Sequence, residues 1–365
     1  MTLQNSAFRI KENLELKGQN MDSTNNSYQS PPPPPYYGMQ RSKGTGWKIF
    51  FGIILGMSVI ANVILFLALI AVGSVMLAGA GRQVFYNEKL IQEGPASNKI
   101  VVINIEGIIN NKLAELVEEQ IKSAQKDKNI KALIFRTISP GGAVAASDRL
   151  YYRINKYRSE TGNPAVAFMD TLAASGGYYT SAACDKIIAE PTVITGSIGV
   201  IMGHFVLQDL LEQKLGIKPL IVKSGTKKDW PTSFEPVTEE QIAYLNNKLI
   251  IPTYERFVSI VAESRKDALT IEQVRALADG SIYNAQEALD NKLIDKIGYL
   301  PDAIELAKSL ANITKAKVVE YEKPFSLENL LGAETLFQQF SHNALYELTT
   351  PQLMYLWQPS VGISR

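Results

Sequence analysis

Apolar and charged positions divide the chain into stretches of different character. The first 46 residues are polar, and from Ile49 to Gly81 there is no charged side chain. From residue 98 onward, apolar runs alternate with amphipathic stretches. We therefore predict, in chain order, a disordered Pro-rich tail at 1–46, a transmembrane signal anchor at 47–81, a linker at 82–97, a globular domain at 98–321 and a partly helical C-terminal tail at 322–365.

The uncharged stretch is longer than the about 20 residues that a helix needs to cross a bilayer. Arg41, Lys43 and Lys48 precede it with no acid among them, whereas charges of both signs follow it. The positive-inside rule then predicts a cytoplasmic N-terminus and an extracytoplasmic domain. The alternative is a cleavable signal peptide with a site at 78–80. The stretch exceeds the about 7 to 15 apolar residues of such peptides, so an uncleaved anchor is favoured.

Beyond the anchor, the apolar pattern predicts strands that alternate with helices. The expected strands are apolar on both sides, which favours an α/β domain with a mostly parallel sheet that is covered on both faces. In such a sheet the functional site lies at the strand ends. The predicted strands are 99–105, 132–136, 165–169, 186–189, 218–223 and 317–320; the predicted helices are 113–125, 143–157, 176–183, 206–215, 238–263, 270–279, 285–291 and 301–311.

The composition limits the kinds of molecule that we expect the protein to bind. The formal net charge is +1 and no block of like charges occurs, so the sequence gives no indication of nucleic-acid binding. One cysteine and two histidines supply no ligand set of the zinc type, and we expect neither a metal nor a cofactor.

Pro31 to Pro35 is either a docking segment for an aromatic groove or a solvated spacer. Apolar positions in 327–357 predict a face that packs on the domain or on another subunit.

Three glycine-rich segments point to acyl-transfer chemistry. Ser175, in Ala-Ser-Gly-Gly, follows a predicted strand and opens a helix, where a tight turn and the helix N-terminus suit a nucleophile. The backbone N–H groups of Gly142, in Ser-Pro-Gly-Gly, and of Gly176 could together stabilise an oxyanion. Ser197, in Thr-Gly-Ser-Ile-Gly, is either the third member of a catalytic triad, where its hydroxyl orients the base, or a turn serine.

With histidine almost absent, lysine is the next candidate for the base. Lys227 and Lys228 are equal candidates from spacing alone, and either would need burial to lower its pKa from about 10.4 toward 7. For Lys228 the carboxylate of Asp229 should point away, because a nearby negative charge opposes that shift. His204 is a weaker candidate without an orienting acid in sequence, and His342 is weaker still.

Together these segments resemble the SppA-type signal peptide peptidases, Ser/Lys-dyad relatives of the Clp protease and crotonase fold. The motifs are Ser-Pro-Gly-Gly at 139–142, Ala-Ser-Gly-Gly-Tyr-Tyr at 174–179, Thr-Gly-Ser-Ile-Gly-Val at 195–200 and Lys-Ser-Gly-x-x-Lys-Asp at 223–229. The resemblance covers roughly 98–312 and implies the nucleophile at Ser175, the base at Lys228, the lysine-orienting hydroxyl at Ser197, and the oxyanion donors at Gly142 and Gly176.

The same resemblance implies a single-pass membrane protein that degrades cleaved signal peptides on the extracytoplasmic (periplasmic) side. Short members of the family form ring-like homo-oligomers in which serine and lysine can come from adjacent subunits. For such substrates we expect a pocket that favours small or apolar residues before the cleaved bond. Two alternatives are a related membrane protease for misfolded proteins and a non-catalytic membrane scaffold with the same fold.

Overall fold

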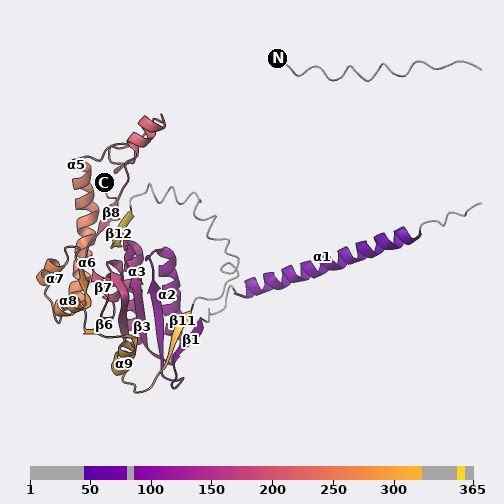
Figure 1. The fold of residues 1–365 in the computed structure, drawn as a ribbon, viewed down its shortest axis with the longest axis horizontal. Coiled ribbons are helices and arrows are strands. Elements are labelled where there is room, and N and C mark those ends of the chain that lie inside the picture. The colour runs from indigo at the N-terminus through magenta and orange to yellow at the C-terminus, as the bar shows by residue number, and fades with distance from the viewer. Residues whose placement is uncertain (1–44, 80–85, 323–351, 358–365) are drawn as a thin grey trace, which may run out of the picture. The chain divides into compact units, whose positions relative to one another are not determined.

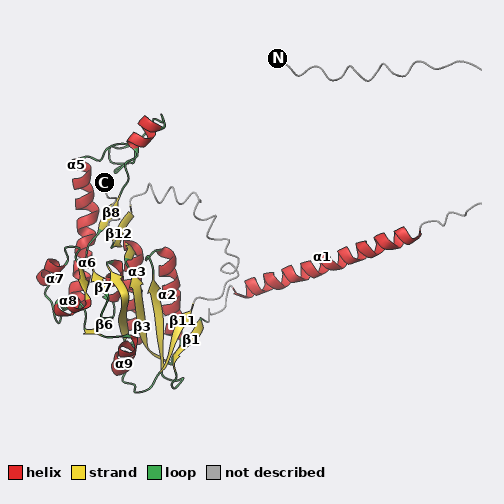
Figure 2. Ribbon diagram, viewed as in Figure 1, coloured by secondary structure: helices red, strands yellow, loops and turns green. Residues whose placement is uncertain are grey.

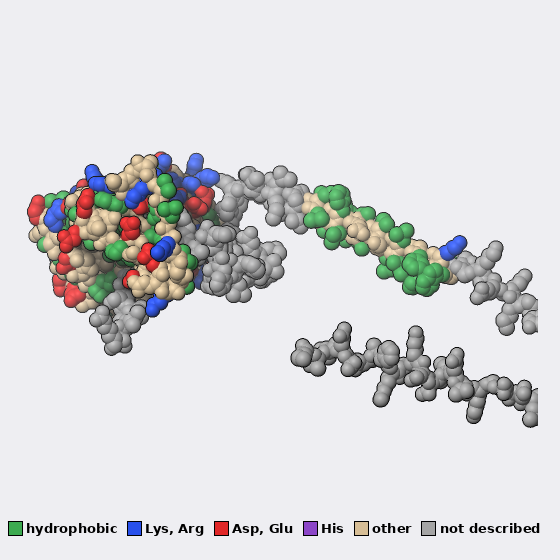
Figure 3. Space-filling view, turned by 90° about the horizontal axis from the view of Figure 1, so that it is seen from above, with side chains coloured by type: hydrophobic (Ala, Val, Ile, Leu, Met, Phe, Trp, Pro, Cys, Tyr) green, Lys and Arg blue, Asp and Glu red, His purple; other side chains and the backbone are tan. Residues whose placement is uncertain are grey.

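A computed structural model describes residues 45–79, 86–322 and 352–357. The chain divides into two compact units, Met1–Gly81 and Arg82–Arg365. Within the first unit, α1 (Thr45–Gly79) is a single helix, and its segment Gly46–Ile70 has a mean hydropathy of 2.8 with no buried side chain. Figure 3 shows hydrophobic side chains along this helix. Among the described residues it is the one helix that is long and apolar enough to span a membrane.

The second unit is built on a nine-stranded sheet in which β1-β11-β2-β3-β5-β6-β10 lie in this order, while β7 pairs with β5 and β9 pairs with β7. The pairs along β11-β2-β3-β5-β6-β10 are parallel, as is β5 with β7, whereas β1 and β9 pair antiparallel. The predicted α/β class with a mostly parallel sheet is thus confirmed (Figure 2). The strands are β1 Asn87–Gln92, β2 Lys99–Glu106, β3 Ile130–Ser139, β5 Ala165–Ala174, β6 Lys186–Ala189, β7 Ile194–Gly196, β9 Ile282–Asn284, β10 Lys296–Ile297 and β11 Lys317–Glu322.

Helices cover both faces of this sheet (Figure 1). Along β2 the side chains alternate, so that Val101 and Ile103 pack in the larger core cluster with α2 and α3, while Ile100 and Val102 pack in a second cluster with α9. The helices are α2 Asn111–Lys126, α3 Val144–Thr161, α4 Gly176–Ser181, α5 Glu239–Leu245, α6 Ile251–Ser264, α7 Ile271–Leu277, α8 Ala285–Asp290 and α9 Leu300–Leu310, with π-helical turns at Leu210–Lys214 and Asn246–Ile250.

A smaller antiparallel sheet has the order β4-β12-β8 and consists of β4 Gly141–Ala143, β12 Gln352–Leu356 and β8 Ile201–Gly203. Its middle strand comes from the C-terminal tail. The tail therefore packs on the domain through a strand at this point, whereas its predicted helical part lies outside the described residues.

Three sequence-based assignments need correction. The predicted linker at 82–97 contains β1, which completes an edge of the main sheet beside β11. The predicted strand at 218–223 is irregular, with Leu220 and Val222 about nine-tenths exposed (90% and 91%), because no described strand lies beside it. The predicted helix at 206–215 is shorter, starting at residue 208 and continuing as the π-helical turn Leu210–Lys214.

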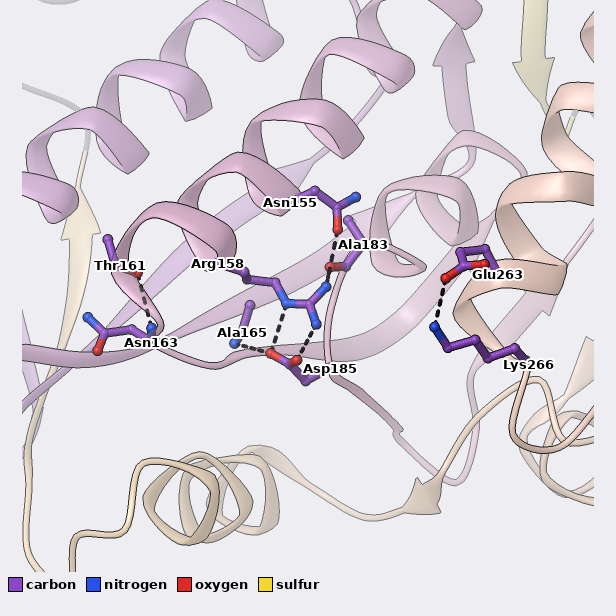
Figure 4. A network of polar contacts seen from close by, with 9 residues as sticks. All are labelled: Asn155, Arg158, Thr161, Asn163, Ala165, Ala183, Asp185, Glu263 and Lys266. Carbon is purple, nitrogen blue, oxygen red and sulfur yellow. Dashed lines mark hydrogen bonds and ion pairs between the residues drawn. The ribbon is translucent and has the colours of Figure 1, made fainter.

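A polar network joins the end of α3 to the start of β5 (Figure 4). Arg158, near the end of α3, donates from Nε to Asp185 Oδ2 at 2.9 Å and from Nη1 to the Ala183 carbonyl at 2.6 Å, and its Nη2 donates to Asp185 Oδ1. Asp185 Oδ2 also accepts from the backbone N–H of Ala165, the first residue of β5, at 2.8 Å. One carboxylate thus fixes the helix end and the start of the strand that leads to Ser175.

We expect Asp185→Ala to lower the free energy of unfolding by about 2 kcal/mol, because it leaves Nε and Nη2 of Arg158 and the backbone N–H of Ala165 without their acceptor. Glu263→Ala is the control. It removes a pair with Lys266 whose side chains are 68% and 64% exposed, and it should leave the unfolding midpoint unchanged. Thermal unfolding of the detergent-solubilised protein measures both, and equal midpoints for the two variants would contradict the role of Asp185.

Candidate active site

The three glycine-rich segments lie close together because each occurs where a strand ends, and these neighbouring parallel strands end on the same side of the sheet. Ser139 ends β3, Ser175 follows β5, and Ser197 follows β7. β5 pairs with both β3 and β7. These three segments therefore lie at the strand ends, where the sequence analysis expects the functional site.

Ser175 has an unusual backbone conformation for a residue with a side chain, with φ 53° and ψ −114°. Its N–H donates to the carbonyl of Gly196 at 2.8 Å, and its own carbonyl accepts from the N–H of Tyr179 at 2.8 Å as α4 begins. Such strained conformations persist where the surrounding structure enforces them, and they concentrate at functional sites. The turn holds Ser175 between the ends of two strands at the start of a helix.

Hydrogen bonds of the Ser139 side chain stabilise the Ser-Pro-Gly-Gly turn. Ser139 Oγ donates to the carbonyl of Gly107 at 2.6 Å and accepts from the N–H of Gly141 at 3.0 Å. Gly141 has φ 98°, a conformation that favours glycine. At Gly142 a Cβ would lie 2.1 Å from the carbonyl oxygen of Ile109, so a side chain does not fit without moving the backbone. Both glycines are required by the shape of the turn.

A peptide carbonyl lies against these glycines. β12 pairs antiparallel with β4 in a register that sets Tyr355 opposite Gly142. A Cβ built on Gly141 would lie 1.9 Å from the Tyr355 carbonyl oxygen, and one built on Gly176 would lie 3.0 Å from it. The position expected for an oxyanion, between the Ser-Pro-Gly-Gly turn and the start of α4, thus holds a carbonyl oxygen from the tail.

Ser175 and Ser197 line the same cavity, which has a volume of about 510 Å³. Ser197 also has a positive φ, 49°, and its N–H donates to the carbonyl of Ser281 at 2.7 Å. Leu356 and Trp357 of the tail complete one side of the cavity. The structure therefore brings together the two serines and the two glycine segments that the sequence singled out.

The lysines lie elsewhere in the single chain. Lys228 is exposed in the irregular segment between β8 and α5, and it does not line the cavity of Ser175. In Figure 1 this segment, red, extends past β8 away from the main sheet. Lys227 Nζ lies over the rings of Tyr244 and Trp230, 4.4 Å and 5.1 Å from their centroids.

Asp229 points toward Lys223, with both carboxylate oxygens 2.9 Å from its Nζ, and this hydrogen bond lowers the pKa of Asp229. As expected, its side chain is thus engaged away from Lys228. His204 has no hydrogen-bond partner at either ring nitrogen, so nothing orients it as a base. His342 lies outside the described residues, and within the described ranges no three His, Cys, Asp or Glu side chains gather as metal ligands would.

An aromatic pocket beside the two glycine segments was not anticipated from the sequence. Tyr179 and Phe257 contact the fully buried ring of Tyr355 at centroid distances of 4.8 Å and 4.7 Å. Tyr179 donates its phenolic hydroxyl to Asp148 Oδ1 at 2.6 Å, and burial raises its pKa. The signal was present in the Ala-Ser-Gly-Gly-Tyr-Tyr motif, where the second tyrosine lies one helical turn beyond Ser175.

Comparisons with known proteins find peptidases among the relatives of this chain. Residues 158–314 match the model of Peptidase family S49. A protein of Enterococcus faecium that is named as a signal peptide peptidase SppA is 35% identical over 64% of this chain and 70% of its own length. A Synechocystis protein that is named as a protease is 34% identical over 67% and 87% of the two chains. The chloroplastic serine protease SPPA of Arabidopsis thaliana is 35% identical over 60% of this chain, but over only 32% of its own.

Two solved structures have a similar chain path. The membrane-bound stomatin-specific protease 1510-N is matched over 63% of this chain and all of that one, at a TM-score of 0.41 and 15% identity. ClpP1 from Listeria monocytogenes is matched over 56% and 94%, at a TM-score of 0.35 and 18% identity. On the extent of the sequence matches to the Enterococcus and Synechocystis proteins, the chain belongs to peptidase family S49 and is a serine endopeptidase.

Proposed function

We propose that this protein is a membrane-anchored peptidase with a Ser/Lys dyad that degrades cleaved signal peptides on the extracytoplasmic face of the membrane. Ser175 is the nucleophile and Lys228 the base. Ser197 orients the neutral lysine, and the N–H groups of Gly142 and Gly176 stabilise the oxyanion.

One observation carries the proposal: a strained serine at the start of a helix lies beside two glycine segments, and a peptide carbonyl oxygen lies against both of them. Ser175 attacks the carbonyl carbon of the substrate while its proton passes to the lysine amine. Negative charge then develops on the carbonyl oxygen, which lies where the Tyr355 oxygen does now. Stabilisation by a backbone N–H there contributes about 3 to 4 kcal/mol to lowering the barrier.

The lysine would come from a neighbouring copy of the chain. This is supported by the exposed apolar side chains of the segment that carries Lys228, which two copies would bury between them. The exposed large hydrophobic residues of this segment are Phe205, Val206, Leu210, Leu215, Ile217, Leu220, Ile221 and Val222. Burial in such an interface would also supply the desolvation that a neutral lysine requires. A ring-like homo-oligomer follows from one interface of this kind repeated in a closed cycle.

Of the two lysines, Lys228 suits the role better. Lys227 contacts two aromatic faces, which bind a cation. Lys228 has no such contact among the described residues, and the carboxylate beside it is engaged by Lys223. These contacts favour Lys228 as the group that loses its proton.

The anchor and the apolar pocket support signal peptides as substrates. The apolar core of a released signal peptide stays in or at the membrane, and α1 would keep the peptidase there. The pocket at the site is aromatic and aliphatic, with Tyr254, Ile250 and Ile251 beside the serine cavity. The basic residues before α1 favour the orientation with a cytoplasmic N-terminus.

The substrate class is tested by comparing the rates at which two substrates are hydrolysed. The detergent-solubilised full-length protein should hydrolyse a synthetic signal peptide at least about 10-fold faster than a reduced, unfolded soluble protein at equal mass, because only the peptide presents a continuous apolar stretch. Ser175→Ala is the control for contaminating proteases. Equal rates on both substrates would contradict the assignment and favour a general protease for misfolded proteins.

A further inference from the structure

The strand β5 changes its neighbour shortly before it reaches Ser175. Residues 166–169 pair with β6 and residues 172–174 pair with β7, so that Asp170 and Thr171 pair with neither. We propose that Asp170 is a positioning residue, which fixes the course of β5 at this point and thereby the place of Ser175. The inference rests on the proposed function, because it takes Ser175 as the nucleophile.

The strand is also irregular on its other side. On β3, Thr137 and Ser139 lie opposite residues 169 and 173 of β5. A single residue of β3 thus faces three residues of β5, and the excess forms a bulge at 170–172. A bulge redirects the strand that follows it, and here that strand leads directly into Ser175. The shape of the bulge therefore sets the direction in which Ser175 is presented.

Thr171, inside the bulge, has a strained backbone. Its φ is 59°, a left-handed conformation that a β-branched residue rarely adopts. Such a conformation persists only where neighbouring groups enforce it. The carboxylate of Asp170 does so with both oxygens: Oδ1 accepts from Thr171 Oγ1 at 2.7 Å, and Oδ2 accepts from Arg136 Nε at 2.8 Å and from its Nη2. One side chain thus links the strained residue to β3.

The carboxylate of Asp170 is charged although only 10% of the side chain is exposed. Burial opposes the ionised form, but the hydrogen bonds from Thr171 and Arg136 outweigh it and lower the pKa of Asp170. Glu190, directly after β6, faces the same carboxylate, and burial together with the charge of Asp170 raises the pKa of Glu190. Asp170 is thus the acid that holds the negative charge, and its charge-assisted hydrogen bonds are stronger than those of a neutral side chain.

A shift at the bulge would reach Ser175 through a small ladder of strands. Residues 172–174 pair with β7, which pairs with β9, and each of these segments has three residues. Ser175 and Ser197 directly follow the first two of them. Because hydrogen bonds join the segments, a displacement at the bulge should move both serines relative to the Ser-Pro-Gly-Gly turn on β3. A displacement of about 1 Å can lower a rate by about 100-fold.

The test compares two carboxylates that hold the two ends of β5. We expect Asp170→Ala to lower kcat for peptide hydrolysis, and the rate of labelling by a fluorophosphonate, by about 10- to 100-fold. KM should not change, because Asp170 does not line the cavity of Ser175. Asp185→Ala is the matched control: it also deprives an arginine of its acceptor, at the start of β5, and should keep the wild-type kcat. Both variants are measured as detergent-solubilised full-length protein, below their unfolding midpoints.

Two further variants keep the test decisive if Asp170→Ala does not fold. Asp170→Asn retains the size of the side chain and should slow labelling to a similar degree, because an amide has one acceptor oxygen where the carboxylate uses two. Combined with Arg136→Gln, it should slow labelling no further than either change alone, because both remove the same pair.

The outcomes separate this inference from the proposed function. Wild-type kcat in the Asp170 variants, or an equal loss in Asp185→Ala, overturns the positioning role and leaves the peptidase assignment standing. A raised KM with an unchanged kcat overturns it too, since Asp170 would then act on binding. A Ser175→Ala protein that still hydrolyses peptide and takes the label overturns the proposed function itself. Loss of kcat in the Asp170 variants but not in Asp185→Ala supports the inference.

Discussion

Replacing Ser175 by alanine should lower kcat for peptide hydrolysis by about 10⁴- to 10⁶-fold and abolish labelling by a fluorophosphonate. The reason is that Ser175 occupies a strained turn at the start of α4, beside the Ser-Pro-Gly-Gly turn. Binding should survive, because the substitution leaves unchanged the strands β4 and β8, with which residues 352–356 pair in this structure. The KM of the residual activity should therefore change little.

Ser159→Ala is the matched control for this variant, since Ser159 is exposed on α3 and donates only to the carbonyl of Lys156. It should retain full labelling and full activity. If Ser175→Ala kept the fluorophosphonate label, the nucleophile would have to be sought at Ser197, the other serine of the cavity.

Replacing Lys228 by alanine or by arginine should lower activity by about 10²- to 10⁴-fold, the range for loss of a general base. Arginine should not rescue it, because a guanidinium keeps its proton in a protein. Lys227→Arg preserves a cation over Tyr244 and Trp230 and should remain active. Rates measured on one peptide for the three variants decide between the two lysines. Full activity of Lys228→Arg would exclude Lys228 as the base.

The same variants test whether the dyad is shared between subunits. Ser175→Ala and Lys228→Ala chains, co-expressed in equal amounts, would place an intact serine beside an intact lysine at roughly a quarter of random contacts between adjacent copies. Activity should then reappear in the mixture although each variant alone is inactive. An inactive mixture that forms mixed oligomers would argue for a dyad within one chain.

The long elements of the fold could be predicted because each has a clear pattern of apolar positions. The strands β2, β3 and β5 bury apolar runs, and the amphipathic helices α2 and α3 bury one face. Strands of two or three residues, such as β7 and β10, carry too few positions to show a period and form only because a neighbouring strand is already in place. The apolar run at 218–223 was wrongly predicted to be a buried strand. Apolar side chains can face a partner copy as well as a core, so such a run does not by itself indicate burial within one chain.

The proximity of three candidate residues at the strand ends could be predicted as well. Ser175, Ser197 and Gly142 each follow a strand, and parallel strands bring their ends to one edge. The pocket around Tyr355 could not be predicted, because it depends on pairing between the C-terminal tail and strands far from it in sequence. Lys228 remains a prediction, since its surroundings in an assembly are not set by the contacts of one chain.

The pairing of β1 with β11 bears on how the domain responds to mechanical load. Asn87 at the start of β1 lies opposite Glu322 at the end of β11, so the segments that lead to the anchor and to β12 leave the main sheet from the same end of one antiparallel pair. Once β12 has detached, tension between the anchor and the chain beyond β11 would therefore open this pair one residue at a time rather than break all its hydrogen bonds at once. The edge strand would peel away at low force while the sheet that carries Ser175 stayed folded.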